Sequence, residues 1–232
     1  MLEPIGPDIW LAEGACVDFY GFAYPTRSVI VRLADGGLWV WSPIALSDAL
    51  KAEVEALGPV AHLVSPNPIH HLFLGDWKAA FPGARLWAPA STQKKRDDLD
   101  FEPPLTGETP EAWAGQIDQV WFNGSLWLDE IVFFHRASGT AILADLSENF
   151  SEAFLQANWS WWQRPIARLW GIVEGRGYAP LEWRLSFVRR KTTRAARDAV
   201  LAWDAERVVM AHGEWIREGG RDYLARALDW IG

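Results

Sequence analysis

The chain has 232 residues, half of them hydrophobic, which suits one large domain or two small ones with a well-buried core. Its net charge of −8 argues against a nucleic-acid backbone or an anionic membrane as partner. The single cysteine, Cys16, excludes an internal disulfide and fits a cytoplasmic location. We expect neither a secretory signal nor a membrane span.

The first half of the chain predicts antiparallel strands followed by a βαβ unit. Residues 9–12, 17–20, 29–33 and 38–41 have the apolar character of strands, the last two joined by turn residues 34–37. Ser47 is a good N-cap for a helix that Gly58 ends. Strand 60–64, helix 72–80 and strand 84–88 follow, an order typical of parallel pairing.

The second half predicts more strands and then helices. A short helix over 91–99 and a loop over 101–109 lead into these elements. The expected strands are 119–122, 130–135, 140–144 and 207–211, and the expected helices are 148–162, 165–173, 193–203 and 221–231. This order predicts mixed sheets with helices outside. No linker rich in Gly, Ser or Pro divides the chain, so we expect a single domain over residues 1–232.

Polar side chains follow three of the predicted strands, where ligands and catalytic groups concentrate in α/β folds. His70 and His71 follow strand 60–64, Asp145 follows strand 140–144, and His212 follows strand 207–211. Taken singly, each is more simply a capping or turn residue. Taken together, they form a first shell suited to zinc or iron.

Three segments resemble an uncharacterised bacterial family, a domain of unknown function in the metallo-β-lactamase superfamily. They are Val-Ser-Pro-Asn-Pro-Ile-His-His from residue 64, Phe-Phe-His-Arg-Ala-Ser-Gly-Thr-Ala-Ile-Leu-Ala-Asp-Leu from residue 133, and Val-Val-Met-Ala-His-Gly-Glu-Trp from residue 208. The resemblance spans residues 9–231. It implies a four-layer αββα sandwich with a metal site along one edge of its two sheets.

The superfamily's hallmark His-x-His-x-Asp-His turn is degenerate in this chain. The resemblance sets its last His on His71, its Asp on His70, and its two earlier His residues on Pro66 and Pro68. The next superfamily His would fall within residues 123–125, which are Asn-Gly-Ser. Because proline has no side-chain ligand, the first of two metal positions is lost.

The second metal position keeps its residues. The resemblance assigns it His71, the bridging Asp145 and the final His212, with His70 in place of Asp. A single zinc, iron or manganese ion is therefore the expected cofactor, and a metal-free protein is the alternative.

Other candidate residues have weaker support. Glu214 is a candidate proton carrier if it points inward. We interpret His135 and His62 as structural and Asp76 as a surface residue. The basic tracts 94–96 and 189–191 are interpreted as solvated faces.

The sequence contains 16 tryptophans, and most of these should fill the core. Three of them, Trp159, Trp161 and Trp162, are close in the sequence. Three interpretations of this group are open: it belongs to the core, it lines an apolar pocket, or it forms a patch where a second copy docks.

Two functions remain open. The first is a metal-dependent hydrolase of a small ester, amide, lactone or phosphoester. The second is a non-catalytic descendant of the fold that binds a small ligand or a protein, as a homo-oligomer or alone. A metal-free enzyme that uses the histidine pair in acid–base chemistry is a third, weaker interpretation.

Overall fold

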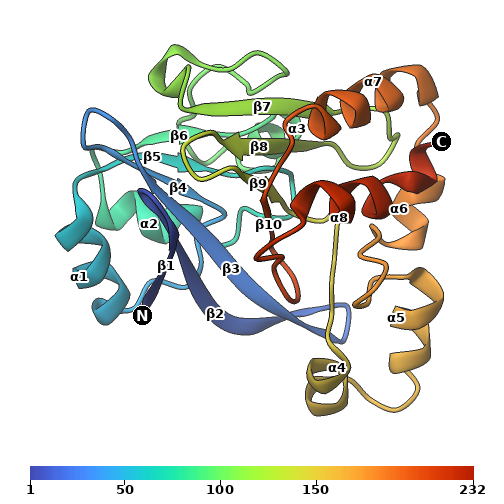
Figure 1. Cartoon of the computed structure of the whole chain (residues 1–232). Helices are drawn as coiled ribbons and strands as arrows, with labels where there is room; N and C mark the ends of the chain where they lie inside the picture. The colour runs from blue at the N-terminus through green and yellow to red at the C-terminus, as the bar shows by residue number, and fades with distance from the viewer.

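The computed structural model describes all 232 residues and contains two mixed sheets. The first sheet has the strand order β1-β2-β3-β4-β5-β6 (Figure 1). Its strands are β1 Leu2–Gly6, β2 Ile9–Phe19, β3 Phe22–Arg32, β4 Leu38–Trp41, β5 Val60–Val64 and β6 Arg85–Trp87. Strands β1 to β4 pair antiparallel, whereas β4–β5 and β5–β6 pair parallel, which confirms the predicted βαβ order.

The second sheet has four strands in the order β10-β9-β8-β7. They are β7 Ile117–Phe122, β8 Glu130–His135, β9 Thr140–Leu143 and β10 Arg207–Met210. Strand β10 pairs parallel to β9, so the C-terminal ends of both strands lie at the same edge of the sheet.

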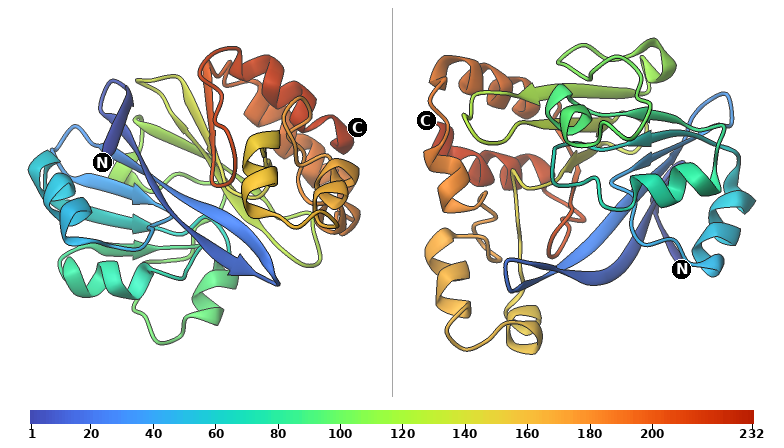
Figure 2. Two further views of the ribbon diagram at one scale, coloured as in Figure 1. Left: turned by 90° about the horizontal axis from the view of Figure 1, so that it is seen from below. Right: turned by 180° about the vertical axis from the view of Figure 1, so that it is seen from behind.

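Helices cover the outer face of each sheet (Figure 2). On the first sheet they are α1 Asp48–Leu57, α2 Leu74–Ala80 and α3 Ala90–Lys95. On the second sheet lie α6 Leu181–Leu185, α7 Arg190–Leu201 and α8 Gly220–Ala227, whereas α4 Glu152–Asn158 and α5 Arg164–Trp170 pack against the β2–β3 hairpin of the first sheet. Two 3₁₀ turns, η1 Glu111–Trp113 and η2 Asp229–Ile231, complete the chain. No helix combines the length and the apolar character needed to cross a bilayer.

Three layers of buried side chains hold the sandwich together. The middle layer joins the two sheets and contains the fully buried Trp39, Trp41 and Phe133. One outer layer packs α1 and α2 on the first sheet through Val54 and Trp77. The other packs the second sheet against α6, α7 and α8. Because a helix layer lies outside each sheet, the predicted αββα architecture is confirmed.

Several local expectations need adjustment. The segments 9–12 and 17–20 are one strand, β2, in which a bulge between Gly14 and Val17 interrupts the pairing with β3. The predicted helix 148–162 begins only at Glu152, where the Ser151 hydroxyl accepts a hydrogen bond from the N–H of Phe154. Ser47 caps α1 as predicted, by accepting from the N–H of Leu50.

The tryptophan group is divided by burial. Trp159 is buried, and its Nε1 donates to the carbonyl of Ala23. Trp161 and Trp162 are 80% and 52% exposed. The core interpretation therefore holds for Trp159 alone.

Candidate metal site

Three side chains from separate strand ends meet at one edge of the two sheets. His70 lies in the turn after β5, Asp145 follows β9, and His212 follows β10. The Nε2 atoms of His70 and His212 lie 3.1 and 3.3 Å from opposite oxygens of Asp145. One ligand atom from each residue fits within a 4.8 Å span, so these three residues can hold one metal ion.

The site is almost closed to solvent. The side chains of His70, Asp145 and His212 are 10%, 6% and 9% exposed. Trp41 stacks on the His70 ring with centroids 6.1 Å apart, and Tyr24 meets the His212 ring edge-on at 4.9 Å. Aromatic packing on both sides fixes the ring planes and excludes water.

Asn67 fixes the geometry of the site through its hydrogen bonds. It is fully buried, and its Nδ2 donates to Oδ2 of Asp145 at 2.6 Å and to Oε2 of Glu130 at 3.1 Å. Its Oδ1 accepts from the backbone N–H groups of Ile69 and His70. The Asn67 amide thus connects the turn that carries His70 to the carboxylate of Asp145, which His70 faces.

Glu130, the first residue of β8, supports Asp145 through the backbone. Its two carboxyl oxygens accept from the N–H groups of Ala144 and Asp145, both at 2.8 Å. Burial first, and the nearby charge of Asp145 second, raise the pKa of Glu130 to about 7, although the two backbone N–H groups oppose this.

The neighbouring charges set the ionisation of Asp145 and His70. Burial alone would raise the pKa of Asp145, but His70 and His212 outweigh it and hold that pKa well below its usual range. Burial alone would lower the pKa of His70, but the charges of Asp145 and Glu130 and the hydrogen bond to Asp145 raise it instead. The carboxylate is therefore ionised at neutral pH.

The other ring nitrogens have partners that orient the imidazoles. Nδ1 of His70 lies 2.7 Å from the hydroxyl of Ser42, and Nδ1 of His212 lies 2.7 Å from the carbonyl oxygen of Pro25. A carbonyl can only accept, so His212 carries its proton on Nδ1. Its Nε2 is then free to act as a ligand, as is usual for metal-binding histidines.

The structure does not bring His71 into this group. Its ring nitrogen Nδ1 is buried without a hydrogen-bond partner, and its carbonyl accepts from Leu74 and Arg96. Burial and the charges of Lys95 and Arg96 lower the pKa of His71 to about 4. Of the two adjacent histidines, the structure therefore brings only His70 to Asp145 and His212.

The remaining candidates lie elsewhere. Glu214 is exposed and meets Asn149 only through backbone atoms, so its side chain does not point inward as a proton carrier would require. His135 Nδ1 pairs with the Ser138 hydroxyl, and His62 Nδ1 accepts from Trp87, as structural histidines do. Asp76 is exposed, as expected.

The sequence interpretation missed several supporting residues. Glu130 begins a strand whose next four residues are apolar, and Asn67 lies between two prolines, so each is an unusual residue for its place in the sequence. A second buried acid, Glu148, accepts from the Tyr24 hydroxyl at 3.4 Å. Burial and the charge of Asp145 raise the pKa of Glu148 well above its ordinary value.

Comparisons with known proteins agree with this fold. The profile of a family described as "Domain of unknown function (DUF4336)" matches residues 8–94. No curated protein matches the sequence.

Solved structures that resemble the chain include three metal proteins. One is a metallo-β-lactamase from Hirschia baltica, with a TM-score of 0.63, 14% identity, and coverage of 100% of this chain and 97% of that one. Another is FIM-1 from Pseudomonas aeruginosa in its mono-zinc form, at 0.63, 13%, and 99% and 94% coverage. The metal-soaked Flv1 flavodiiron core from Synechocystis sp. PCC6803 gives 0.65, 11%, and 100% and 60% coverage.

These comparisons define the fold of the protein. The chain has the metallo-β-lactamase fold over its whole length. The resemblance to a family described as a domain of unknown function is confirmed over residues 8–94, from the start of β2 into α3.

Proposed function

We propose that the chain binds one divalent metal ion through Nε2 of His70, Nε2 of His212 and the carboxylate of Asp145, and that it is a metal-dependent hydrolase. Two imidazoles and one carboxylate are a ligand set for zinc or non-haem iron, and manganese is a further candidate. Such a set leaves at least one coordination position for water or substrate. His71 is not part of the proposed set.

The orientation of the His212 ring carries the proposal. Because its Nδ1 donates to the carbonyl of Pro25, its Nε2 is the atom that faces a carboxylate oxygen of Asp145, 3.3 Å away. The lone pairs of this nitrogen and this oxygen repel one another unless a proton or a metal ion lies between them. A ligand atom of His70 lies within 4.8 Å of both, and this third ligand favours the metal ion.

A single ion is favoured over a pair. The positions that the resemblance assigns to the first ion hold Pro66, Pro68 and residues 123–125, none of which is a histidine. The similar FIM-1 structure, described as a mono-zinc form, is consistent with one ion in this fold.

The chemistry of the site follows from these residues. A bound ion would act as a Lewis acid and lower the pKa of a water molecule. Asp145, kept ionised and held by Asn67, can accept a hydrogen bond from that water and orient it. A small ester, amide, lactone or phosphoester is the substrate class that we propose for such an ion.

The near closure of the site also favours a second candidate, a non-catalytic protein in which the ion is structural. An ion whose ligand side chains expose at most 10% of their area has little room for substrate. We retain the cytoplasm as the expected location, a small molecule as the expected ligand, and a homo-oligomer as an option.

Elemental analysis of protein purified without chelator tests the proposal, with one equivalent of metal per chain expected. His70→Ala and His212→Ala should each abolish metal binding. His62 lies within strand β5, away from the site, so His62→Ala should retain metal binding. A metal-free protein that also ignores added zinc, iron and manganese would overturn the proposal. Loaded protein that hydrolyses none of a set of nitrophenyl esters, lactones and phosphoesters would favour the structural ion.

A further inference from the structure

The segment from Trp183 to Arg197 is strongly basic in an otherwise acidic protein. It contains six basic residues and no acidic one, while the whole chain carries a net charge of −8. The six are Arg184, Arg189, Arg190, Lys191, Arg194 and Arg197. The solvated face expected for this tract does not explain why its charges are so concentrated.

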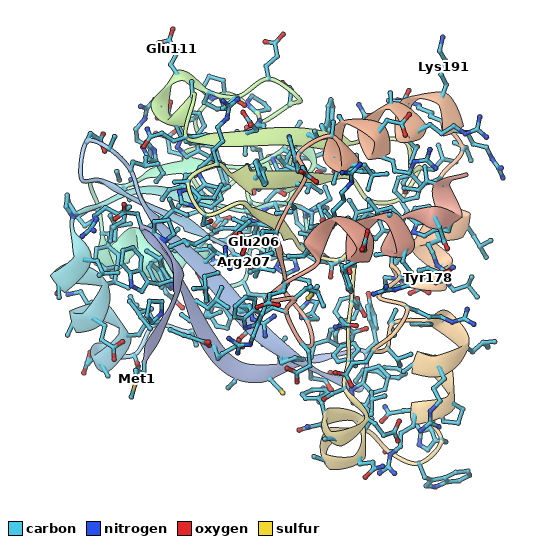
Figure 3. All side chains as sticks on the ribbon, in the orientation of Figure 1. Met1, Glu111, Tyr178, Lys191, Glu206 and Arg207 are labelled. Carbon is cyan, nitrogen blue, oxygen red and sulfur yellow. The ribbon has the colours of Figure 1, made fainter.

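The cations at the start of α7 have no carboxylate partners. Arg189, Arg190 and Lys191 form no ion pair, and all three are exposed. Figure 3 shows Lys191 pointing away from the body of the protein. Positive charges at a helix N-terminus oppose the helix dipole, so they are not placed there for the stability of α7.

A small hollow lies beside these cations, between α6, α7 and η2. It has a volume of about 50 Å³ and is lined by Arg184, Phe187, Arg190, Thr193, Trp230 and Ile231. Pockets for drug-sized ligands measure roughly 300–1,000 Å³, so this hollow suits a single small group.

Two cationic side chains that line the hollow have free donors. The side chain of Arg190 has no hydrogen-bond partner, and Arg184 makes one hydrogen bond, through Nη2, so its Nη1 is free to donate. An acceptor group from outside could therefore pair with both guanidinium groups. Arginine forks match the oxygens of phosphate particularly well.

Arg184 is held in place by its neighbours. Its Nη2 donates to the carbonyl of Trp170 at 2.6 Å, and its guanidinium lies 4.7 Å from the centroid of the Tyr178 ring. Burial lowers the pKa of Arg184, and the charges of Asp229 and Glu182 act in the opposite direction. Neither carboxylate forms an ion pair with Arg184, so its positive charge and its Nη1 remain available to an anion.

Exposed apolar side chains lie next to these cations along the chain. Leu185 and Val188, on the chain between Arg184 and Arg189, are 74% and 55% exposed. The N–H of Leu126 donates to the carbonyl of Ser186, which brings the exposed Leu126 and Trp127 beside them. Cations mixed with exposed leucine and tryptophan are typical of surfaces that lie on a bilayer.

We infer that this basic corner, the α6–α7 junction with its hollow, binds the phosphate group of an anionic phospholipid headgroup. Arg184, through Nη1, and Arg190 would donate to the phosphate oxygens, and Leu185 and Val188 would enter the apolar boundary. The overall negative charge does not prevent this contact, because charges farther than about 8 Å are screened at physiological ionic strength. The inference is independent of the proposed metal site.

Vesicle cosedimentation tests the inference with the full-length protein. We expect binding to vesicles of phosphatidylcholine with phosphatidylglycerol, no binding to pure phosphatidylcholine, and weaker binding at higher salt. Arg190→Gln and Arg184→Gln should each weaken binding by about tenfold or more, as expected for a lost charge-assisted hydrogen bond. Arg190 is exposed, so its variant keeps the test valid if Arg184→Gln misfolds.

Matched controls separate the site from general charge and general hydrophobicity. Lys94→Gln removes one exposed cation on α3, and Leu169→Ser removes an exposed leucine on α5, and neither should change vesicle binding. Leu185→Ser should weaken it. His212→Ala should bind vesicles like the unaltered protein.

Titration with inorganic phosphate distinguishes the source of the anion. Saturable phosphate binding that Arg190→Gln weakens, together with vesicle binding, supports the inference. Phosphate binding without vesicle binding would overturn the lipid assignment. Absence of both, or vesicle binding equal in Arg190→Gln, Arg184→Gln and Lys94→Gln, would overturn the inference as a whole.

Discussion

Replacing Asn67 with alanine should weaken both the fold and the metal site. The change removes two donated hydrogen bonds, to Asp145 at 2.6 Å and to Glu130 at 3.1 Å. It also removes the acceptor for the N–H groups of Ile69 and His70. All these groups lie at a site where water has little access, so they would stay unsatisfied.

The expected cost is large for a single substitution. Hydrogen bonds to charged groups contribute about 1.5–3 kcal/mol each, and such contributions are not additive, so we expect the free energy of unfolding to fall by about 3–5 kcal/mol. A protein of ordinary stability, about 5–15 kcal/mol, would lose a large share of it. Metal affinity should fall about 10- to 100-fold, as for other residues that orient ligands.

Urea denaturation of metal-free protein, followed by tryptophan fluorescence, measures the effect. Asn158→Ala is the control, because Asn158 is exposed on α4 and its loss should change stability by no more than about 0.5 kcal/mol. Asn67→Asp keeps the acceptor but sets a third carboxylate against Asp145 and Glu130, so it should be destabilising as well. A loss for Asn67→Ala no greater than for Asn158→Ala would refute the reasoning.

Three further predictions concern pH, backbone and packing. Because its neighbours lower the pKa of Asp145 in the folded state, Asp145 stabilises the fold above its unfolded pKa of about 3.9, and this contribution should disappear as the pH falls through the lower folded value. Below about pH 4, where the raised pKa values of Glu130 and His70 no longer change the stability, urea midpoints that do not fall toward acid would contradict this. Gly213→Ala should cost more than about 2 kcal/mol, since its Cβ would clash with backbone atoms of Asn149, whereas Gly175→Ala, also at positive φ but in open space, should cost only about 1 kcal/mol. Equal thermal shifts would show that the close approach is absent. Trp159→Ser should lower the free energy of unfolding by about 3–5 kcal/mol, because Trp159 is buried, and Trp161→Ser by less than about 0.5 kcal/mol. Calorimetry measures this difference, and equal losses would contradict the burial of Trp159.

Much of the fold was predictable because its signals are local. The strands 60–64 and 130–135 are apolar runs with clear ends, and the structure gives them the same bounds. The Ser47 cap and the βαβ order depend on neighbouring residues only. The bulge in β2 disturbs the alternation that marks a strand, so the sequence predicts two short strands, 9–12 and 17–20, in place of one long strand. Helix α6, with five residues, is too short to show a helical period.

The site was predictable only in outline. Polar residues after strand ends indicated His70, Asp145 and His212, but the choice between His70 and His71 depends on how the turn rotates each side chain. The contacts that Asn67 makes with Glu130 and Asp145 join residues 63 and 78 positions apart, which no local pattern reveals. The basic corner likewise required knowledge of which cations lack partners.

Anomalous diffraction from crystals of the protein grown with zinc is the most direct test of the central claim, that His70, Asp145 and His212 together hold a single ion. We expect one strong peak at the zinc edge, about 2.0–2.2 Å from Nε2 of both imidazoles and from an oxygen of Asp145. The same crystals of His212→Ala should lack that peak. Density that shows the two imidazoles and the carboxylate in direct contact, with no peak between them, would contradict the claim.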